Sequence, residues 1–114
     1  MDKGFSSRKE IVTFKFSLRS FNFSPIVDIN HHEENKLLKD RTFGNDIKTI
    51  ITLASEYVKG SLSGGILPVL KHFPGHGRVI SDSHISHCIS NTSFDELIIS
   101  DLLPFQEIAN TFTQ

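Results

Sequence analysis

The sequence has 114 residues, a hydrophobic fraction of 38% and a formal net charge of -1. The apolar content is too high for an intrinsically disordered chain, and the length fits one domain or part of one. The near-zero charge gives no general attraction to nucleic acid or to an anionic membrane, so we expect neither as a partner.

Residues 1–20 form a poorly defined N-terminal segment. Apolar residues alternate with more polar ones between Val12 and Leu18, which fits a strand, although a short helix is also compatible. Charges interrupt the segment, so it lacks the apolar run of a secretory signal, and the single Cys88 cannot form an internal disulfide. We therefore expect a cytoplasmic protein.

The next predicted element is a buried strand over residues 21–29, FNFSPIVDI, which is rich in apolar and β-branched residues. Pro25 has no N–H to donate to a ladder, so we expect it at a bulge, at an edge or at the strand start. Asp28 lies at the carboxyl end of this strand and leads into a polar loop over residues 30–45.

An amphipathic helix is predicted over residues 46–62, because apolar residues recur there at helical spacing. Asn45 or Asp46 is expected to cap its start, and Gly64-Gly65 to end it. The short apolar run of residues 66–70 predicts a second buried strand, which leads into a second polar loop that ends near Asn91.

Ser93 and Glu96 have the spacing of a capping box, which predicts a helix from about Phe94. Pro104 either breaks this helix or starts another. The resulting βαβα order implies parallel strands with right-handed crossovers. Because the carboxyl ends of parallel strands share one edge, the two polar loops should face the same side and form one site.

The second loop begins with KHFPGHGRVISDSH, residues 71–84, which is dense in titratable side chains. Pro74, Gly75 and Gly77 exclude a regular element there. A zinc site is one alternative explanation, with possible ligands at His72, His76, Asp82, His84, His87 and Cys88. The i, i+4 spacing of the first two would bring them together only on a helix, which Pro74 and Gly75 exclude, so we expect no metal. We expect no other cofactor either.

Together with this loop, three other segments resemble the β-N-acetylglucosaminidase branch of glycoside hydrolase family 3. They are FSPIVDI (residues 23–29), RTFGND (41–46) and DLLPFQEI (101–108). The resemblance covers about residues 18–110 and implies that residues 21–114 are a fragment of the family's N-terminal (β/α)8 barrel, with about two βα units. It also implies removal of terminal N-acetylglucosamine from glycans such as peptidoglycan fragments.

By the same resemblance, His84 is the general acid/base and Asp82 is its dyad partner. An imidazole suits this role because it titrates near neutrality, and a nearby carboxylate fixes its tautomer. Most retaining glycosidases use two carboxylates instead. Gly75 and Gly77 would let the loop move His84 into and out of the site.

The residues that the resemblance places at the substrate are Arg41, Lys71, His72 and Asp28. Of these, Asp28 lies either near the sugar or behind the site as a support, and a turn-forming aspartate remains an alternative. We expect His76 to hold the loop between its glycines. The other loop residues, namely His31, His32, His87 and Cys88, are predicted to have no special role.

A complete barrel of this type needs about 250 residues. The family's nucleophile lies in a motif resembling Ser-Asp-Asp-Leu, which is absent from these 114 residues. Asp101 is no substitute, because it falls inside the predicted helix. We therefore expect the isolated chain to be inactive and marginally stable, with a complementary chain as a candidate partner. The alternative is a non-catalytic remnant that at most binds sugar.

Overall fold

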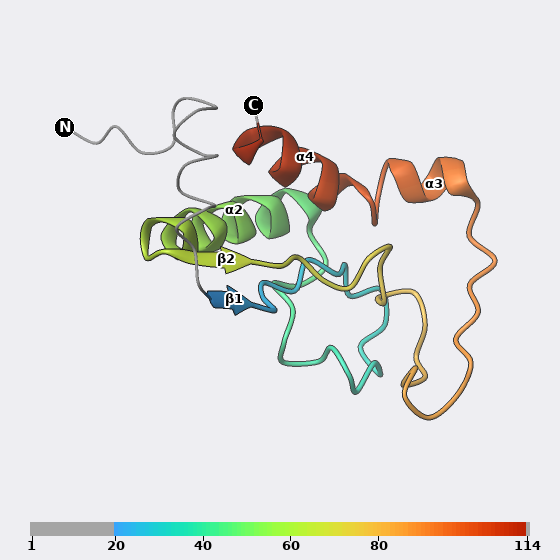
Figure 1. Ribbon diagram of the computed structural model, residues 1–114. Coiled ribbons are helices and arrows are strands. Elements are labelled where there is room, and N and C mark those ends of the chain that lie inside the picture. The colour runs from blue at the N-terminus through green and yellow to red at the C-terminus, as the bar shows by residue number, and fades with distance from the viewer. Residues whose placement is uncertain (1–19, 114) are drawn as a thin grey trace.

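The computed structural model describes residues 20–113. Its elements are β1 (Ser20–Asn22), α2 (Ile47–Ser63), β2 (Ile66–Pro68), α3 (Phe94–Ile98) and α4 (Leu103–Phe112). The two strands form a parallel sheet, and α2 packs along β2 and α4 (Figure 1). The predicted parallel α/β arrangement is confirmed. The predictions for residues 1–19 lie outside the described residues.

The first strand is shorter than predicted because it is interrupted at Pro25. β1 ends at Asn22, and parallel pairing resumes only as a bridge between Ile26 and Lys71. There the N–H of Val27 donates to the carbonyl of Lys71 at 2.8 Å. Proline has no N–H with which to continue the ladder, so the break falls at this residue.

The hydrophobic core lies between the end of the first strand segment and the helices. Its buried members are Val27, Ile29, Ile50, Ala54, Val58 and Ile108. The prediction of a wholly buried strand is wrong for Phe21 and Phe23, which are 67% and 68% exposed, because no element within residues 20–113 covers them. The strand is therefore buried only after Pro25, next to the loops.

The helix α2 forms as predicted and extends to Ser63. Asp46 caps its first turn: one carboxylate oxygen accepts the N–H of Thr49 at 2.9 Å and its hydroxyl at 2.6 Å. These hydrogen bonds lower the pKa of Asp46. The buried stripe of α2 faces the core, as its spacing requires.

The C-terminal part contains two helices rather than one. The Ser93 side chain accepts the N–H of Glu96 at 3.2 Å and starts α3, as the capping box predicted. Pro104 lies in the first turn of α4, so the second alternative for this residue is the correct one. The prediction that Asp101 lies inside a helix is wrong. The residue lies in the turn between α3 and α4, where it is buried. No helix within residues 20–113 is long and apolar enough to span a membrane.

Candidate active site

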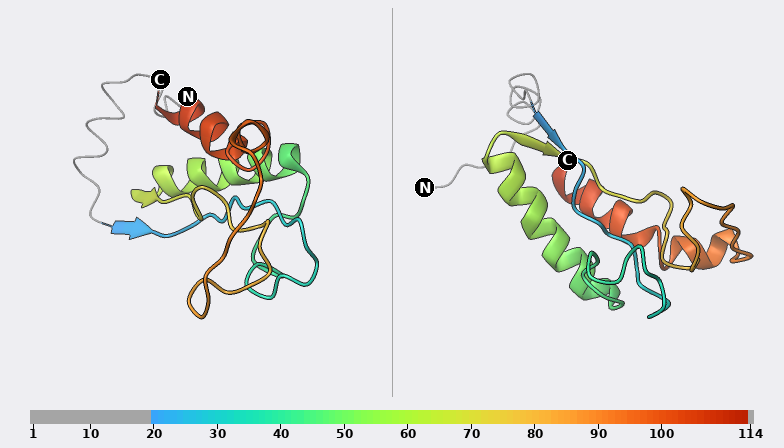
Figure 2. Two further views of the ribbon diagram at one scale, coloured as in Figure 1. Left: turned by 90° about the vertical axis from the view of Figure 1, so that its right-hand side faces the viewer. Right: turned by 90° about the horizontal axis from the view of Figure 1, so that it is seen from below.

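The two polar loops leave the carboxyl ends of the strands and lie side by side (Figures 1 and 2). We call residues 30–45 the first loop and residues 71–92 the histidine loop. The fully buried Asn35 joins them, because its side-chain amide donates to the carbonyls of His76 at 3.3 Å and Val79 at 2.8 Å. The expected placement of both loops on one side of the sheet is therefore confirmed.

Asp28 and His72 form a pair at the base of the site. An Asp28 carboxylate oxygen lies 2.6 Å from Nδ1 of His72, and the carboxylate also accepts the backbone N–H of His76 at 2.8 Å. Asp28 is only 1% exposed, whereas the His72 side chain is 34% exposed. The carboxylate therefore supports the imidazole from behind. With the Nδ1 proton donated to the carboxylate, Nε2 remains free to accept a hydrogen bond.

His76 packs beside this pair. Its ring meets the His72 ring edge-to-face, with centroids 5.9 Å apart. Its two ring nitrogens are buried and have no hydrogen-bond partner within the described part of the chain. The residue is held by its main chain, through Asp28 and Asn35, and its ring fills space against His72.

Asp82 and His84 form a second pair, in the middle of the histidine loop. One oxygen of Asp82 accepts the backbone N–H of His84 at 2.9 Å and lies 2.9 Å from its Nδ1. The backbone and side-chain hydrogen bonds from His84 lower the pKa of Asp82, which therefore stays ionised. The side chain of His84 is 83% exposed, so its other ring nitrogen is accessible for proton transfer.

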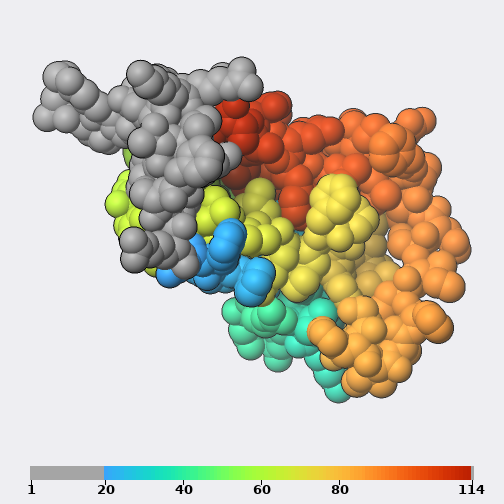
Figure 3. All heavy atoms as spheres, viewed as in Figure 1, coloured from blue at the N-terminus to red at the C-terminus, as the bar shows by residue number. Residues whose placement is uncertain are grey.

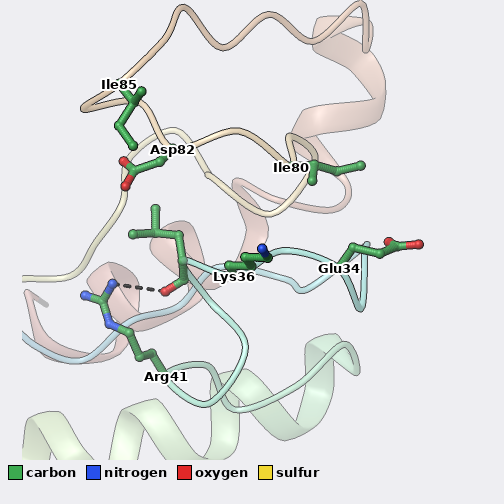
Figure 4. Close-up of a pocket in the computed structure, with 7 residues that line it drawn as sticks. Glu34, Lys36, Arg41, Ile80, Asp82 and Ile85 are labelled. Atoms are coloured by element: carbon green, nitrogen blue, oxygen red, sulfur yellow. Dashed lines mark hydrogen bonds between the residues drawn. The ribbon is translucent and has the colours of Figure 1, made fainter.

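Arg41 and Asp82 line the same hollow, of about 500 Å³, from opposite sides. Figure 4 shows Arg41 and Lys36 on the first loop facing Asp82 and Ile85 on the histidine loop. The residues that line this hollow are Glu34, Lys36, Leu37, Arg41, Ile80, Asp82 and Ile85. Charged groups around an apolar floor are suited to a sugar, which presents both hydroxyls and an apolar C–H face.

Arg41 also borders a second hollow, of about 360 Å³, together with Lys71 and Tyr57. Arg41 thus lines both the hollow beside Asp82 and the hollow beside Lys71. Neither cation forms an ion pair with a carboxylate within residues 20–113, so both are available to a ligand. Within residues 20–113, no three His, Cys, Asp or Glu side chains are placed so that they could hold a metal ion.

A buried carboxylate that the sequence did not predict as important lies behind the histidine loop. Asp101 accepts from Nε of Arg78 at 2.6 Å and lies 2.9 Å from Nε2 of His31. Burial by itself raises the pKa of Asp101, but the hydrogen bonds from Arg78, His31 and Ser100 outweigh it, and the net pKa is lowered. The guanidinium also contacts Glu96 at 3.2 Å.

The prediction that His31 and His32 have no special role is wrong. His31 binds Asp101, and Nε2 of His32 lies 3.2 Å from the carbonyl oxygen of Arg78. These partners are distant along the chain, and no local pattern in the sequence connects them. A polar loop that turns inward at Asn35 resembles an ordinary surface loop in its composition.

Residues 4–112 match the model of the glycosyl hydrolase family 3 N terminal domain. The chain belongs to this family. The match begins upstream of Leu18, so it includes a segment for which the short motifs showed no resemblance. The two parallel strands and their helices are accordingly a part of a family 3 (β/α)8 barrel, as predicted.

The similar proteins are much longer than this chain. Beta-hexosaminidase LpqI of Mycobacterium tuberculosis is 36% identical over 107 residues, which are 94% of this chain and 26% of that protein. A beta-hexosaminidase of Haemophilus influenzae is 32% identical over 94% of this chain and 29% of its own length. The crystal structure of NagZ from Neisseria gonorrhoeae superposes with a TM-score of 0.73 and 33% identity, covering 81% of this chain and 26% of NagZ. The chain therefore spans little more than a quarter of these relatives.

Proposed function

We propose that this chain carries the acid/base part of a retaining β-N-acetylglucosaminidase site. His84 donates a proton to the leaving-group oxygen and then accepts a proton from the attacking water, while Asp82 fixes the tautomer of the His84 ring. Lys71, His72 and Arg41 bind the hydroxyls of a terminal N-acetylglucosamine unit. The observation that carries the proposal is the shared hollow between Arg41 and Asp82, at the carboxyl edge of the parallel strands.

Asp28 has a supporting role in this proposal. Its carboxylate is enclosed and already accepts hydrogen bonds from the His72 and His76 segments, so it orients the His72 ring instead of meeting the sugar. Peptidoglycan fragments as the glycan and the cytoplasm as the compartment belong to the same proposal. Both rest on the resemblance of the sequence motifs, whereas the beta-hexosaminidase names of the relatives support only a hexosaminide as the substrate.

Residues 1–114 contain no Ser-Asp-Asp-Leu motif. We propose that these residues alone form no glycosyl-enzyme intermediate, since loss of one member of a catalytic unit removes most of the rate. A complementary chain that supplies the remaining barrel strands would then be required for turnover. The second candidate function, sugar binding without hydrolysis, is what this proposal predicts for the isolated chain.

Sugar binding is tested by titrating N-acetylglucosamine into the 15N-labelled chain and following the amide resonances. We expect shifts at residues 71–72 and around Arg41, and we expect Lys71→Gln to abolish them. Lys59→Gln is the matched control, because it removes the same charge from the exposed surface of α2, away from the loops. Equal shifts in both variants, or none in the wild-type chain, would contradict the proposed site.

Hydrolysis is tested with 4-nitrophenyl N-acetyl-β-D-glucosaminide. The isolated chain should release no more chromophore than His84→Ala. Addition of a polypeptide carrying the remaining strands of a family 3 barrel should produce turnover that depends on His84. Turnover by the wild-type chain alone would show that these residues contain a nucleophile. Turnover by the mixture with His84→Ala would remove His84 from its assigned role.

A further inference from the structure

The histidine loop consists of two parts that differ in how they are held. We call residues 71–79 the base and residues 80–92 the tip. Every hydrogen bond and ion pair of the tip that the structure shows stays within the tip, and none connects it to any other part of residues 20–113. The tip protrudes next to the first loop (Figure 3).

The base, in contrast, is bonded to three other segments. The first loop donates to the carbonyls of four consecutive residues: His76 and Val79 from Asn35, Gly77 from the N–H of His31, and Arg78 from His32. Asp28 accepts from the base on the strand side. The turn between α3 and α4 binds the Arg78 side chain through Asp101 and Ser100. The last residue of the base with such a bond is Val79.

The two glycines of the base are packing positions. A Cβ built on Gly77 would lie 2.7 Å from the carbonyl carbon of Ile29 and closer still to its oxygen, which no side chain tolerates. A Cβ on Gly75 would lie 3.1 Å from Cβ of Asp101, and the residue has a φ of +133°. Glycine is therefore required here for close approach and for backbone conformation. The expectation that these glycines provide the mobility of the loop does not fit this packing.

We infer that the hinge of the histidine loop lies at Val79–Ile80, and that Asp101, through Arg78, is the positioning residue that fixes it. The ion pair is well suited to this role, since Asp101 is 3% exposed and the Arg78 guanidinium meets three acceptors from α3 and the following turn. Charge-assisted bonds of this kind are among the strongest in proteins.

The position of the hinge matters for the dyad. Both hydrogen bonds between Asp82 and His84 are local, and the carbonyl of Asp82 also accepts the N–H groups of Ile85 and Ser86. The pair therefore moves as one unit, with its tautomer preserved, while His72 stays fixed on the base. As a positioning device for catalysis, this inference rests on the proposed function.

Backbone dynamics test the hinge directly. In the 15N-labelled chain, the {1H}–15N heteronuclear NOE should be as high at residues 75–79 as in α2, should fall at Ile80, and should rise again at α3. In Asp101→Asn, the values at residues 75–79 should fall to the level of the tip. The matched control is Glu96→Gln, which removes the more exposed carboxylate partner of Arg78 and should leave the base unchanged.

Placement of the tip gives a readout that a purely stabilising role would not change. Cys88 is the only cysteine of the chain and lies in the tip, so a nitroxide attached to it reports where the tip is. We expect it to broaden the amide signals of Leu37 and Arg41 in the wild-type chain. In folded Asp101→Asn, with the α2 signals intact, this broadening should decrease at least twofold.

Two results would overturn the inference. The first is a wild-type chain in which residues 75–79 are already as mobile as residues 80–92. The second is a folded Asp101→Asn with a rigid base and unchanged broadening. If Asp101→Asn does not fold, Arg78→Lys retains the charge but loses the fork, and must show the same changes in weaker form. Neither measurement uses a sugar. If the chain binds no N-acetylglucosamine but its heteronuclear NOE still falls at Ile80, the proposed function is refuted and the hinge is retained.

Discussion

Gly77→Ala should be strongly destabilising because the base has no space for a methyl group. The clash is with the backbone of Ile29, which cannot rotate away as a side chain would, so the segment around Gly77 must move out. This movement breaks the contacts of the first loop with the carbonyls of residues 76–79, which are four hydrogen bonds. At about 1 kcal/mol each, their loss amounts to about 4 kcal/mol.

Urea unfolding followed by circular dichroism measures this loss. With a slope of about 2 kcal/mol per molar urea, the midpoint should fall by about 2 M, or the variant should show no folded baseline at all. Gly60→Ala is the matched control, because a Cβ there meets nothing within 4 Å and the residue lies in α2. It should stabilise the chain by about 0.5–1 kcal/mol. A Gly77→Ala midpoint equal to that of the wild-type chain would refute the packing argument.

Three further predictions concern the core, the acid stability and the His72 support. Ile50→Ala should lose about 2–5 kcal/mol of unfolding free energy, whereas Leu53→Ala, on the exposed face of the same helix, should change it by about 0.5 kcal/mol. The lowered pKa of Asp101 contributes stability above about pH 4 that is lost as the pH falls through the folded-state pKa, so urea midpoints should drop on acidification and drop less in Asp101→Asn. Asp28→Asn places amide protons against Nδ1 of His72 and the backbone N–H of His76. It should lower the free energy of unfolding by about 1–3 kcal/mol and change the 15N shifts of the His72 ring.

The parts of the fold that were predictable from the sequence are those determined by local chemistry. The periodic apolar residues of α2, the cap at Asp46 and the capping box at Ser93 involve neighbours within one helical turn, and all three form as predicted. The parallel pairing followed from the order of the elements. The placement of both loops at one edge followed in turn from that pairing.

The contacts that organise the site were not predictable in this way. Asn35 and Asp101 are buried polar residues that join distant segments, because each has two partners far along the chain, 41 and 44 residues from Asn35 and 23 and 70 residues from Asp101. A buried polar group is stable only when it is hydrogen-bonded, but a sequence does not show which distant groups satisfy it. The glycines illustrate the same limit: composition indicates flexibility, whereas the environment of Gly77 shows that its role is close packing.

One continuous motif, KHFPGHGRVISDSH, therefore contains two parts that differ in how they are held. Its first half is fixed to the strand ends and to the turn before α4, and it carries Lys71 and His72, the residues that we propose to bind the sugar. Its second half carries Asp82 and His84 on a segment held only by its own bonds. The proposed general acid/base must approach first the leaving group and then water, so the proposal requires mobility in the second half alone. Close packing at the glycines of the first half and local hydrogen bonds in the second are the structural features that produce this division.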